Sequence, residues 1–314
     1  MMSVQRISGL LAAVLVGVAL GVSAQFESPM LLPNQAGEWI VDQPRVGRTV
    51  SRNIRVEIAG NGFFTVDPEG IQTVRPDIVQ TNHFTVFDLL VKLDQDGQIA
   101  LEYHYDESMG THIIDSLNGE SGWWYEARYS AGWFERNTHR MDHYLVKDET
   151  EVRFSIERAS RLEKLYLAFE EEMARVVAND GKVILPRVTI EGPRREELVF
   201  EDIAVRAHDT RIDVLQPGTV TALDILLSLG EQGFLTQLGI TWYEWIFTAD
   251  PVDHYFVEYI KGGPIDAQAQ GSCGFVYEVG YSSIPGFGGA HIHIPTDTRV
   301  ILAPEYALWF WLCL

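Results

Sequence analysis

The stretch TVFDLLVKL at residues 85–93 returns as TALDILLSL at residues 221–229. In each copy a threonine precedes apolar residues at helical spacing, and an aspartate, Asp88 or Asp224, follows it by three positions. A threonine N-cap with a carboxylate three residues later is typical of a helix start. The sequence therefore predicts a short amphipathic helix in each copy. We interpret both aspartates as helix caps rather than catalytic groups.

Three further blocks extend the repeat in the same order. Residues 114–119 match 257–262, residues 122–127 match 274–279, and residues 143–152 align without a gap on residues 291–300. The offsets between the copies are 136, 143, 152 and 148 residues in chain order, so only the loops between blocks change length. We infer two copies of one α+β fold, in which strands rich in aromatic and β-branched residues surround the helix.

The chain divides into five predicted segments. They are a signal peptide at residues 1–24, a turn-rich arm at 25–52, a first domain at 53–157, a connecting helix at 158–182 and a second domain at 183–314. The connecting helix has apolar residues at three- and four-residue spacings, and it places the glutamates at 170–172 on the solvent side. As a stiff spacer it would fix the orientation of the domains. In the second domain we expect a hairpin of residues 199–207 and 211–215.

The N-terminal segment is typical of an export signal. Arg6 provides positive charge, residues 10–22 are apolar, and Val22-Ser23-Ala24 resembles a cleavage site. The apolar stretch is short for a membrane-spanning helix, which needs about 20 residues. An uncleaved N-terminal anchor is the alternative. We expect an extracytoplasmic protein (secreted, periplasmic or at the cell surface) without a transmembrane segment after signal removal.

Charge limits the classes of partner. The chain has 24 basic and 44 acidic residues, which gives a formal net charge of −20. Nucleic acids and anionic membranes both require a basic face, so neither is an expected partner. Outside the cytosol Cys273 and Cys313 are permitted to form a disulfide. The sequence leaves open whether they pair or pack as free thiols.

The order of these motifs resembles the transcobalamin-C-terminal-like family, a β-grasp module of unknown function in exported bacterial and archaeal proteins. The residues that carry the resemblance are Thr85, Asp88, Leu90, Asn118, Gly119, Gly122, Trp123 and Tyr125 in the first copy and Thr221, Asp224, Leu226, Gly262, Gly274 and Tyr277 in the second. The resemblance implies two tandem β-grasp-like domains joined by an amphipathic helix.

The same resemblance raises a corrinoid as a ligand. In transcobalamin-like carriers this module covers one face of a corrinoid, and a separate helical domain holds the other face. No such helical domain is recognisable in this sequence, which removes the main support for a corrinoid. The chain also departs from the family pattern, since Arg128-Tyr129 and Gly280-Tyr281 stand where an Asn-Gly turn is usual and Phe275 replaces a tryptophan.

A dense aromatic cluster is the candidate ligand-binding surface. It comprises Trp123, Trp124, Tyr125, Tyr129 and Trp133. On a strand Trp123 and Tyr125 point to one face and Trp124 to the other, so we expect one face to meet solvent or ligand. Flat rings beside polar groups suit a small molecule, a glycan or a protein surface. Burial of both faces in the core is the alternative.

His291 and His293 are the candidate metal ligands, because they lie on one face of a predicted strand. Imidazole is the commonest protein ligand for zinc and copper. No third ligand has a diagnostic spacing, so structural or solvated histidines are the alternative.

The sequence has no recognisable triad, paired-glutamate or nucleotide-binding motif. We therefore predict an exported, non-enzymatic binding protein without a resident cofactor, whose partner is a small molecule, a glycan or an envelope protein. The alternatives are a structural cell-envelope module without a small-molecule ligand, and extracytoplasmic zinc or copper binding through His291 and His293.

Overall fold

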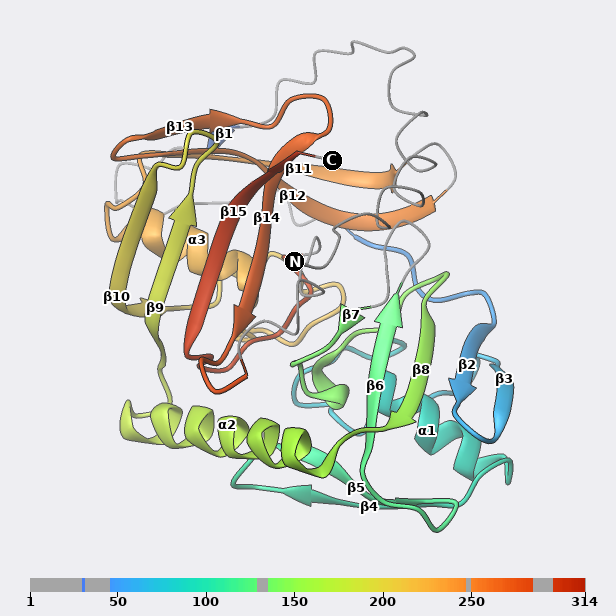
Figure 1. The fold of residues 1–314 in the computed structure, drawn as a ribbon. Helices are drawn as coiled ribbons and strands as arrows, with labels where there is room; N and C mark the ends of the chain where they lie inside the picture. The colour runs from blue at the N-terminus through green and yellow to red at the C-terminus, as the bar shows by residue number, and fades with distance from the viewer. Residues whose placement is uncertain (1–29, 32–45, 129–134, 247–249, 285–295, 314) are drawn as a thin grey trace, which may run out of the picture.

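A computed structural model describes residues 30–31, 46–128, 135–246, 250–284 and 296–313 (Figure 1). Within these ranges the protein is α+β, with three α-helices and four mixed or antiparallel sheets. The predicted signal peptide lies outside the described residues, and so do four candidate site residues. These are Tyr129, Trp133, His291 and His293.

The first half of the chain forms a mixed sheet, a separate hairpin and a helix. Its elements are β2 (Ile54–Ile58), β3 (Gly62–Val66), α1 (Val86–Gln95), β4 (Leu101–Asp106), β5 (Thr111–Leu117), β6 (Trp123–Arg128), β7 (Glu135–Arg136), the 3-10 turn η1 (Met141–His143) and β8 (Glu151–Ile156). The strand order is β3-β2-β8-β6-β7, and β2 and β8 are its parallel pair. Phe87 and Leu90 of α1 are fully buried in one core with Val56 and Phe154 of the sheet.

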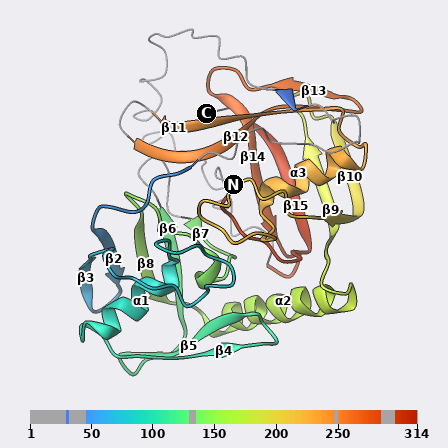
Figure 2. The ribbon, with the colours of Figure 1, turned by 180° about the vertical axis from the view of Figure 1, so that it is seen from behind.

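The second half repeats this plan (Figures 1 and 2). Its elements are β9 (Val183–Glu191), β10 (Glu197–Val205), α3 (Ala222–Glu231), β11 (Gln237–Ile246), β12 (Asp250–Gly262), β13 (Ile265–Gln268), β14 (Cys273–Gly280) and β15 (Tyr306–Cys313). The order β10-β9-β15-β14 again has a parallel central pair, β9 and β15. The short β1 (Met30–Leu31) pairs with β11 at the edge of the other sheet. The two similar mixed sheets, each with its own core, indicate two domains.

Both predicted helix caps are confirmed. Asp88 Oδ2 accepts hydrogen bonds from the backbone N (2.7 Å) and Oγ1 (2.8 Å) of Thr85. Asp224 Oδ2 accepts the same two bonds from Thr221 at the same distances. The second carboxylate oxygen fixes the loop that precedes the helix. Asp88 Oδ1 accepts a hydrogen bond from the backbone N of Val74 at 2.7 Å. The repeated motif therefore encodes a helix start and the anchoring of a loop.

The connecting helix α2 (Ala159–Ala178) packs on both halves. Phe169 inserts into the first core and contacts the ring of Tyr281 from the second half, while Arg175 donates two hydrogen bonds to the carbonyl oxygen of Ala303 (3.0 and 2.6 Å). The prediction that Glu172 faces solvent was wrong. Its carboxylate is buried and pairs with Arg140, which lies under the helix.

Two other sequence-based predictions require correction. Residues 211–214 form turns and Leu215 makes an isolated bridge to Val79, while β10 pairs with β9 instead. The last block of the repeat was also misaligned. Leu145 bridges Thr85, and Val300 bridges Thr221, so Leu145 corresponds to Val300 with an offset of 155 rather than 148 residues. His143 is consequently the counterpart of Thr298, not of His291.

The two halves meet along a seam with approximate two-fold symmetry. Val79 bridges its counterpart Leu215. The backbone N of Gln80 donates to Val214 O (3.0 Å), and in return the backbone N of Gln216 donates to Ile78 O (2.8 Å). A separate apolar cluster fills the seam with three counterpart pairs. They are Ile78 and Val214, Val79 and Leu215, and Leu145 and Val300. Backbone pairing and apolar burial from both halves therefore hold the domains together.

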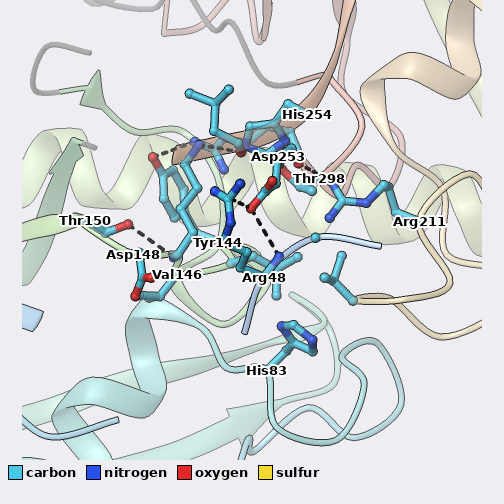
Figure 3. A pocket seen from close by; sticks show the side chains of 16 residues that line it. Arg48, His83, Tyr144, Val146, Asp148, Thr150, Arg211, Asp253, His254 and Thr298 are labelled. Atoms are coloured by element: carbon cyan, nitrogen blue, oxygen red, sulfur yellow. Dashed lines mark hydrogen bonds and ion pairs between the residues drawn. The ribbon is translucent and has the colours of Figure 1, made fainter. Parts of the chain in front are cut away.

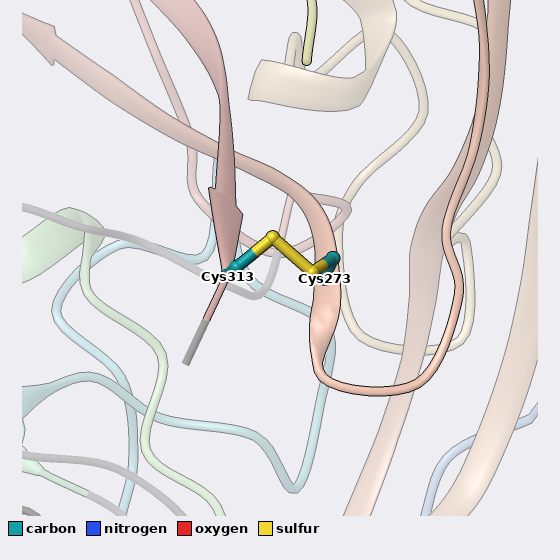
Figure 4. Close-up of a disulfide and its surroundings, with 2 residues drawn as sticks. All are labelled: Cys273 and Cys313. Carbon is teal, nitrogen blue, oxygen red and sulfur yellow. A yellow bond between two sulfur atoms is a disulfide. The ribbon is translucent and has the colours of Figure 1, made fainter.

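The disulfide that the sequence left open is present. Cys273 of β14 and Cys313 of β15 stand directly opposite each other in the antiparallel pair, with their Cα atoms 4.0 Å apart (Figure 4). The bond links the C-terminal strand to its neighbour and closes a loop between two cysteines that are 40 positions apart in the sequence.

Candidate functional site

The seam contains a pocket lined by both halves, which we call the seam pocket (Figure 3). Its lining residues are Gly47, Arg48, His83, Tyr144, Leu145, Val146, Lys147, Asp148, Thr150, Arg211, Val214, Val252, Asp253, His254, Thr298 and Arg299. The cavity has about 40 Å³ of space for water. One water molecule needs roughly 10–15 Å³ of such space, so the pocket suits water or a small anion.

A buried arginine anchors the wall from the second half. Arg211 Nη1 donates to Asp297 Oδ2 (2.8 Å), and its Nε and Nη2 donate to the two oxygens of Asp213 (both 2.9 Å). His254 Nδ1 lies 2.9 Å from Asp297 Oδ1. Burial raises the pKa of Asp297, but His254 and Arg211 outweigh this effect and hold that pKa well below its usual range. Asp297 is thus a buried carboxylate that orients both neighbours.

The first half contains the same arrangement. Arg75 donates to Asp142 (3.2 Å) and, through Nε and Nη2, to Asp77 (2.9 and 2.7 Å). The sequence carries a signal for this cluster outside the four repeated blocks described above. Arg75-Pro76-Asp77-Ile78-Val79-Gln80 returns as Arg211-Ile212-Asp213-Val214-Leu215-Gln216, at the offset of 136 residues that the helix block shows. The clusters are therefore part of the duplicated scaffold.

The copies differ at positions beside the pocket. Gly110 and Asp253 are counterparts, because Gly110 O accepts a bond from Arg75 and Asp253 O accepts the equivalent bond from Arg211. Both residues have positive φ, 65° and 47°. A side chain in this left-handed region costs about 1–3 kcal/mol, although aspartate tolerates it better than most residues. Likewise Thr111 in the first copy is replaced by His254 in the second.

A second pair of counterparts touches across the seam. Tyr144 and Arg299 bridge each other through their backbones, and the Arg299 guanidinium lies 3.8 Å from the centre of the Tyr144 ring. Arg299 Nη2 also donates to the Tyr144 hydroxyl at 2.6 Å. The first half thus supplies an aromatic platform, and the second half supplies the cation that rests on it.

Lys147 of the first half points across the seam, and its Nζ donates to Val252 O at 3.0 Å. The side chain is half-buried. Burial, and then the positive charge of Arg299, lower the pKa of Lys147 well below its usual range. Arg48 completes the rim, since its Nη1 lies 3.3 Å from Asp253 Oδ2. Burial raises the pKa of Asp253.

The three described residues of the predicted aromatic binding surface lie away from the pocket lining. Trp123, Trp124 and Tyr125 are buried, with exposed fractions of 1%, 6% and 1%. Their polar atoms donate to the carbonyl oxygens of Glu120 (2.8 Å), Asn137 (2.8 Å) and His139 (3.0 Å), respectively. The expectation of an exposed surface is therefore wrong for these three residues, because α2 covers the face that carries Trp124.

The metal prediction falls on residues that the structure does not describe. Within the described ranges no group of three or more histidine, cysteine or acidic side chains has a metal-binding arrangement. In the same part of the chain, no helix combines the length and apolar character needed to cross a membrane.

Comparisons of the chain with protein families, with curated proteins and with solved structures find no significant match. The resemblance to the transcobalamin-C-terminal-like family therefore stays a prediction.

Proposed function

We propose that the protein is an exported binding protein built from two β-grasp-like repeats, and that the seam pocket binds the anionic group of a small ligand. The observation that carries this proposal is the local charge. Four of the lining side chains are cationic and two are acidic, although the chain as a whole has 44 acidic and 24 basic residues. A cation-rich concavity on an acidic protein favours a small anion and disfavours general adhesion of polyanions.

The electrostatics of the pocket support an anion more specifically. Arg211 is held by buried carboxylates, and Lys147, Arg299 and Arg48 are the other cations that line the pocket. Lys147 and Arg299 belong to different halves and repel each other, which contributes to the lowered pKa of Lys147. An anion placed between them would relieve this repulsion. The cavity of about 40 Å³ has no room for a corrinoid.

Isothermal titration calorimetry with acetate, sulfate and inorganic phosphate at fixed ionic strength tests the proposal. Lys147→Met removes one charge-assisted hydrogen bond worth about 1.5–3 kcal/mol, so we expect at least about tenfold weaker binding. Lys164→Met is the matched control, because Lys164 is exposed on α2 and does not line the pocket. Equal affinities for the two variants, or no binding of any anion to the wild-type protein, would rule out this site.

The second candidate function is a structural module of the cell envelope. It is favoured by the burial of Trp123, Trp124 and Tyr125 and by the backbone-paired seam, which leaves the two halves in a fixed relation. A wild-type protein that binds no small anion but retains a single cooperative unfolding transition for both halves would favour this alternative.

A further inference from the structure

The β4–β5 hairpin of the first half and the β11–β12 pair of the second half are counterparts. Both pairs have a register shift at the same point, between Glu102 and Tyr103 in β4 and between Gly239 and Ile240 in β11. Glu102 therefore corresponds to Gly239, and Tyr103 to Ile240. The side of β11 that faces away from β12 is covered by β1, in which Met30 lies opposite Gly239. Among the described residues no strand covers the same side of β4, which pairs with β5 alone.

The uncovered strand is also more exposed than its counterpart. Residues 102–105 of β4 are exposed at every position, whereas Gly239 and Ile240 are buried. The β4–β5 hairpin forms the lower margin of the molecule in Figure 1. The rings of Tyr103 and Tyr105 pack against His112 (centroids 5.8 and 5.1 Å apart) but remain 38% and 45% exposed. An edge of this kind presents backbone groups to another chain, and its aromatic side chains can pack against those of an added strand.

A side chain closes only the beginning of this edge. Asp94 Oδ1 accepts a hydrogen bond from the backbone N of Leu101 at 3.0 Å. In the second half Gly230, which has no side chain, stands at the position of Asp94, at the offset of 136 residues. The part of β4 that can accept a further strand is therefore residues 102–106.

Charge indicates which kind of chain fits this edge. Residues 101–117 contain no lysine or arginine and four acidic side chains, which are Glu102, Asp106, Glu107 and Asp115. Pairing with β4 of a second copy is disfavoured, because it would bring like charges together on chains that each have a net charge of −20. An extended segment with lysine or arginine at alternate positions complements the acidic edge.

We propose that β4 binds an extended, basic segment of a partner protein, which pairs antiparallel with residues 102–106 on the side that β1 covers in β11. The backbone of β4 provides the strand pairing, and its acidic side chains select a basic partner. Tyr103 and Tyr105 contact the apolar side chains of the added strand. Residues 101–106 do not line the seam pocket, so this interaction is independent of the proposed anion site.

Fluorescence anisotropy with three labelled peptides tests the proposal on the intact protein. The first peptide alternates lysine and valine, and the second has glutamate in place of each lysine. The third is the lysine–valine peptide with a methyl group on every backbone nitrogen, which keeps the charge but removes the donors that strand pairing needs. We expect the first peptide to bind at least about tenfold more tightly than either of the others.

Hydrogen exchange and a pair of charge reversals locate the binding. In the complex, residues 101–106 should exchange more slowly, and residues 197–205 of the edge strand β10 should not change. Glu102→Lys should weaken binding of the lysine–valine peptide about fivefold or more, because an attraction becomes a repulsion. Glu197→Lys reverses an exposed glutamate on β10 and should change the affinity less than about twofold.

Three results would overturn the proposal. They are no binding of the lysine–valine peptide, equal binding of its methylated form, and slower exchange at residues outside β4 only. Equal binding of the methylated form would indicate general attraction to an acidic protein rather than strand pairing. None of these results bears on acetate binding at the seam pocket, so the two proposals fail separately.

Discussion

At the scale of single residues, the duplicated scaffold is conspicuous for its buried charge. Asp142 and Asp297 each accept bonds from an arginine and from the backbone N of a strand residue, His112 at 3.0 Å or Tyr255 at 3.2 Å. Replacing one partner of such a pair leaves an uncompensated buried charge, which is strongly destabilising. These carboxylates therefore hold the loops around the seam in place, and the variable positions beside them are free to differ between the copies.

Buried histidines predict how stability depends on pH. Burial lowers the pKa of His143 and that of His254 to about 3, whereas an unfolded histidine has a pKa near 6.5. The unfolded chain therefore binds more protons between these values, so stability is complete above pH 6.5 and decreases as pH falls towards 3. We expect the unfolding free energy to drop by roughly 3 kcal/mol for each histidine, about 6 kcal/mol for the two, between pH 7 and pH 4.

Urea titrations at pH 7, 5 and 4 check this expectation. His254→Gln should reduce the dependence on pH. His104→Gln should not, because His104 is exposed on β4. A stability that stays constant from pH 7 to pH 4 would contradict the assignment of neutral buried histidines.

At the scale of elements, the helix starts carry the clearest link between sequence and stability. Asp88 satisfies the backbone N–H groups of Thr85 and Val74 together with a hydroxyl, all in a buried setting. Its counterpart Asp224 does the same for Thr221 and His208. Each aspartate thus fixes a helix and the loop that leads to its arginine cluster.

Removal of either cap should destabilise the protein by similar amounts. Asp88→Ala and Asp224→Ala each leave buried donors without an acceptor, and we expect a loss of about 2–3 kcal/mol in the free energy of unfolding. Asp96→Ala, at the exposed end of α1, removes only a surface pair with Lys92 and should cost less than about 1 kcal/mol. Chemical denaturation of the three variants measures these differences, and an equal loss in all three would contradict the capping role.

At the scale of the whole molecule, α2 and the seam determine how the two repeats combine. The helix packs on both halves, and the seam adds symmetric backbone pairing. The pocket exists only because these elements bring Lys147 of one copy to Arg299 of the other.

Reduction of the disulfide should destabilise the protein. Closing a loop of 40 residues restricts the unfolded chain, which the chain-entropy relation values at roughly 4 kcal/mol. We expect a lower thermal transition after treatment with dithiothreitol under native conditions. A Cys273→Ala/Cys313→Ala variant serves as the control, because its transition should not respond to the reductant. An unchanged transition in the wild-type protein would contradict a structural role for the bond.

The sequence alone determined the duplication, the α+β class, the two capped helices and the connecting helix. These features follow from local patterns, because a helix cap, the spacing of apolar residues and a turn motif each determine the structure of residues close by in the sequence. Only the tertiary structure decided that Trp123, Trp124 and Tyr125 are buried. It also decided that Glu172 forms a buried ion pair with Arg140, and that Cys273 and Cys313 form a disulfide. It also created the seam pocket, whose contacts join residues more than 100 positions apart. Such contacts depend on how complete domains pack, so no local sequence pattern predicts them.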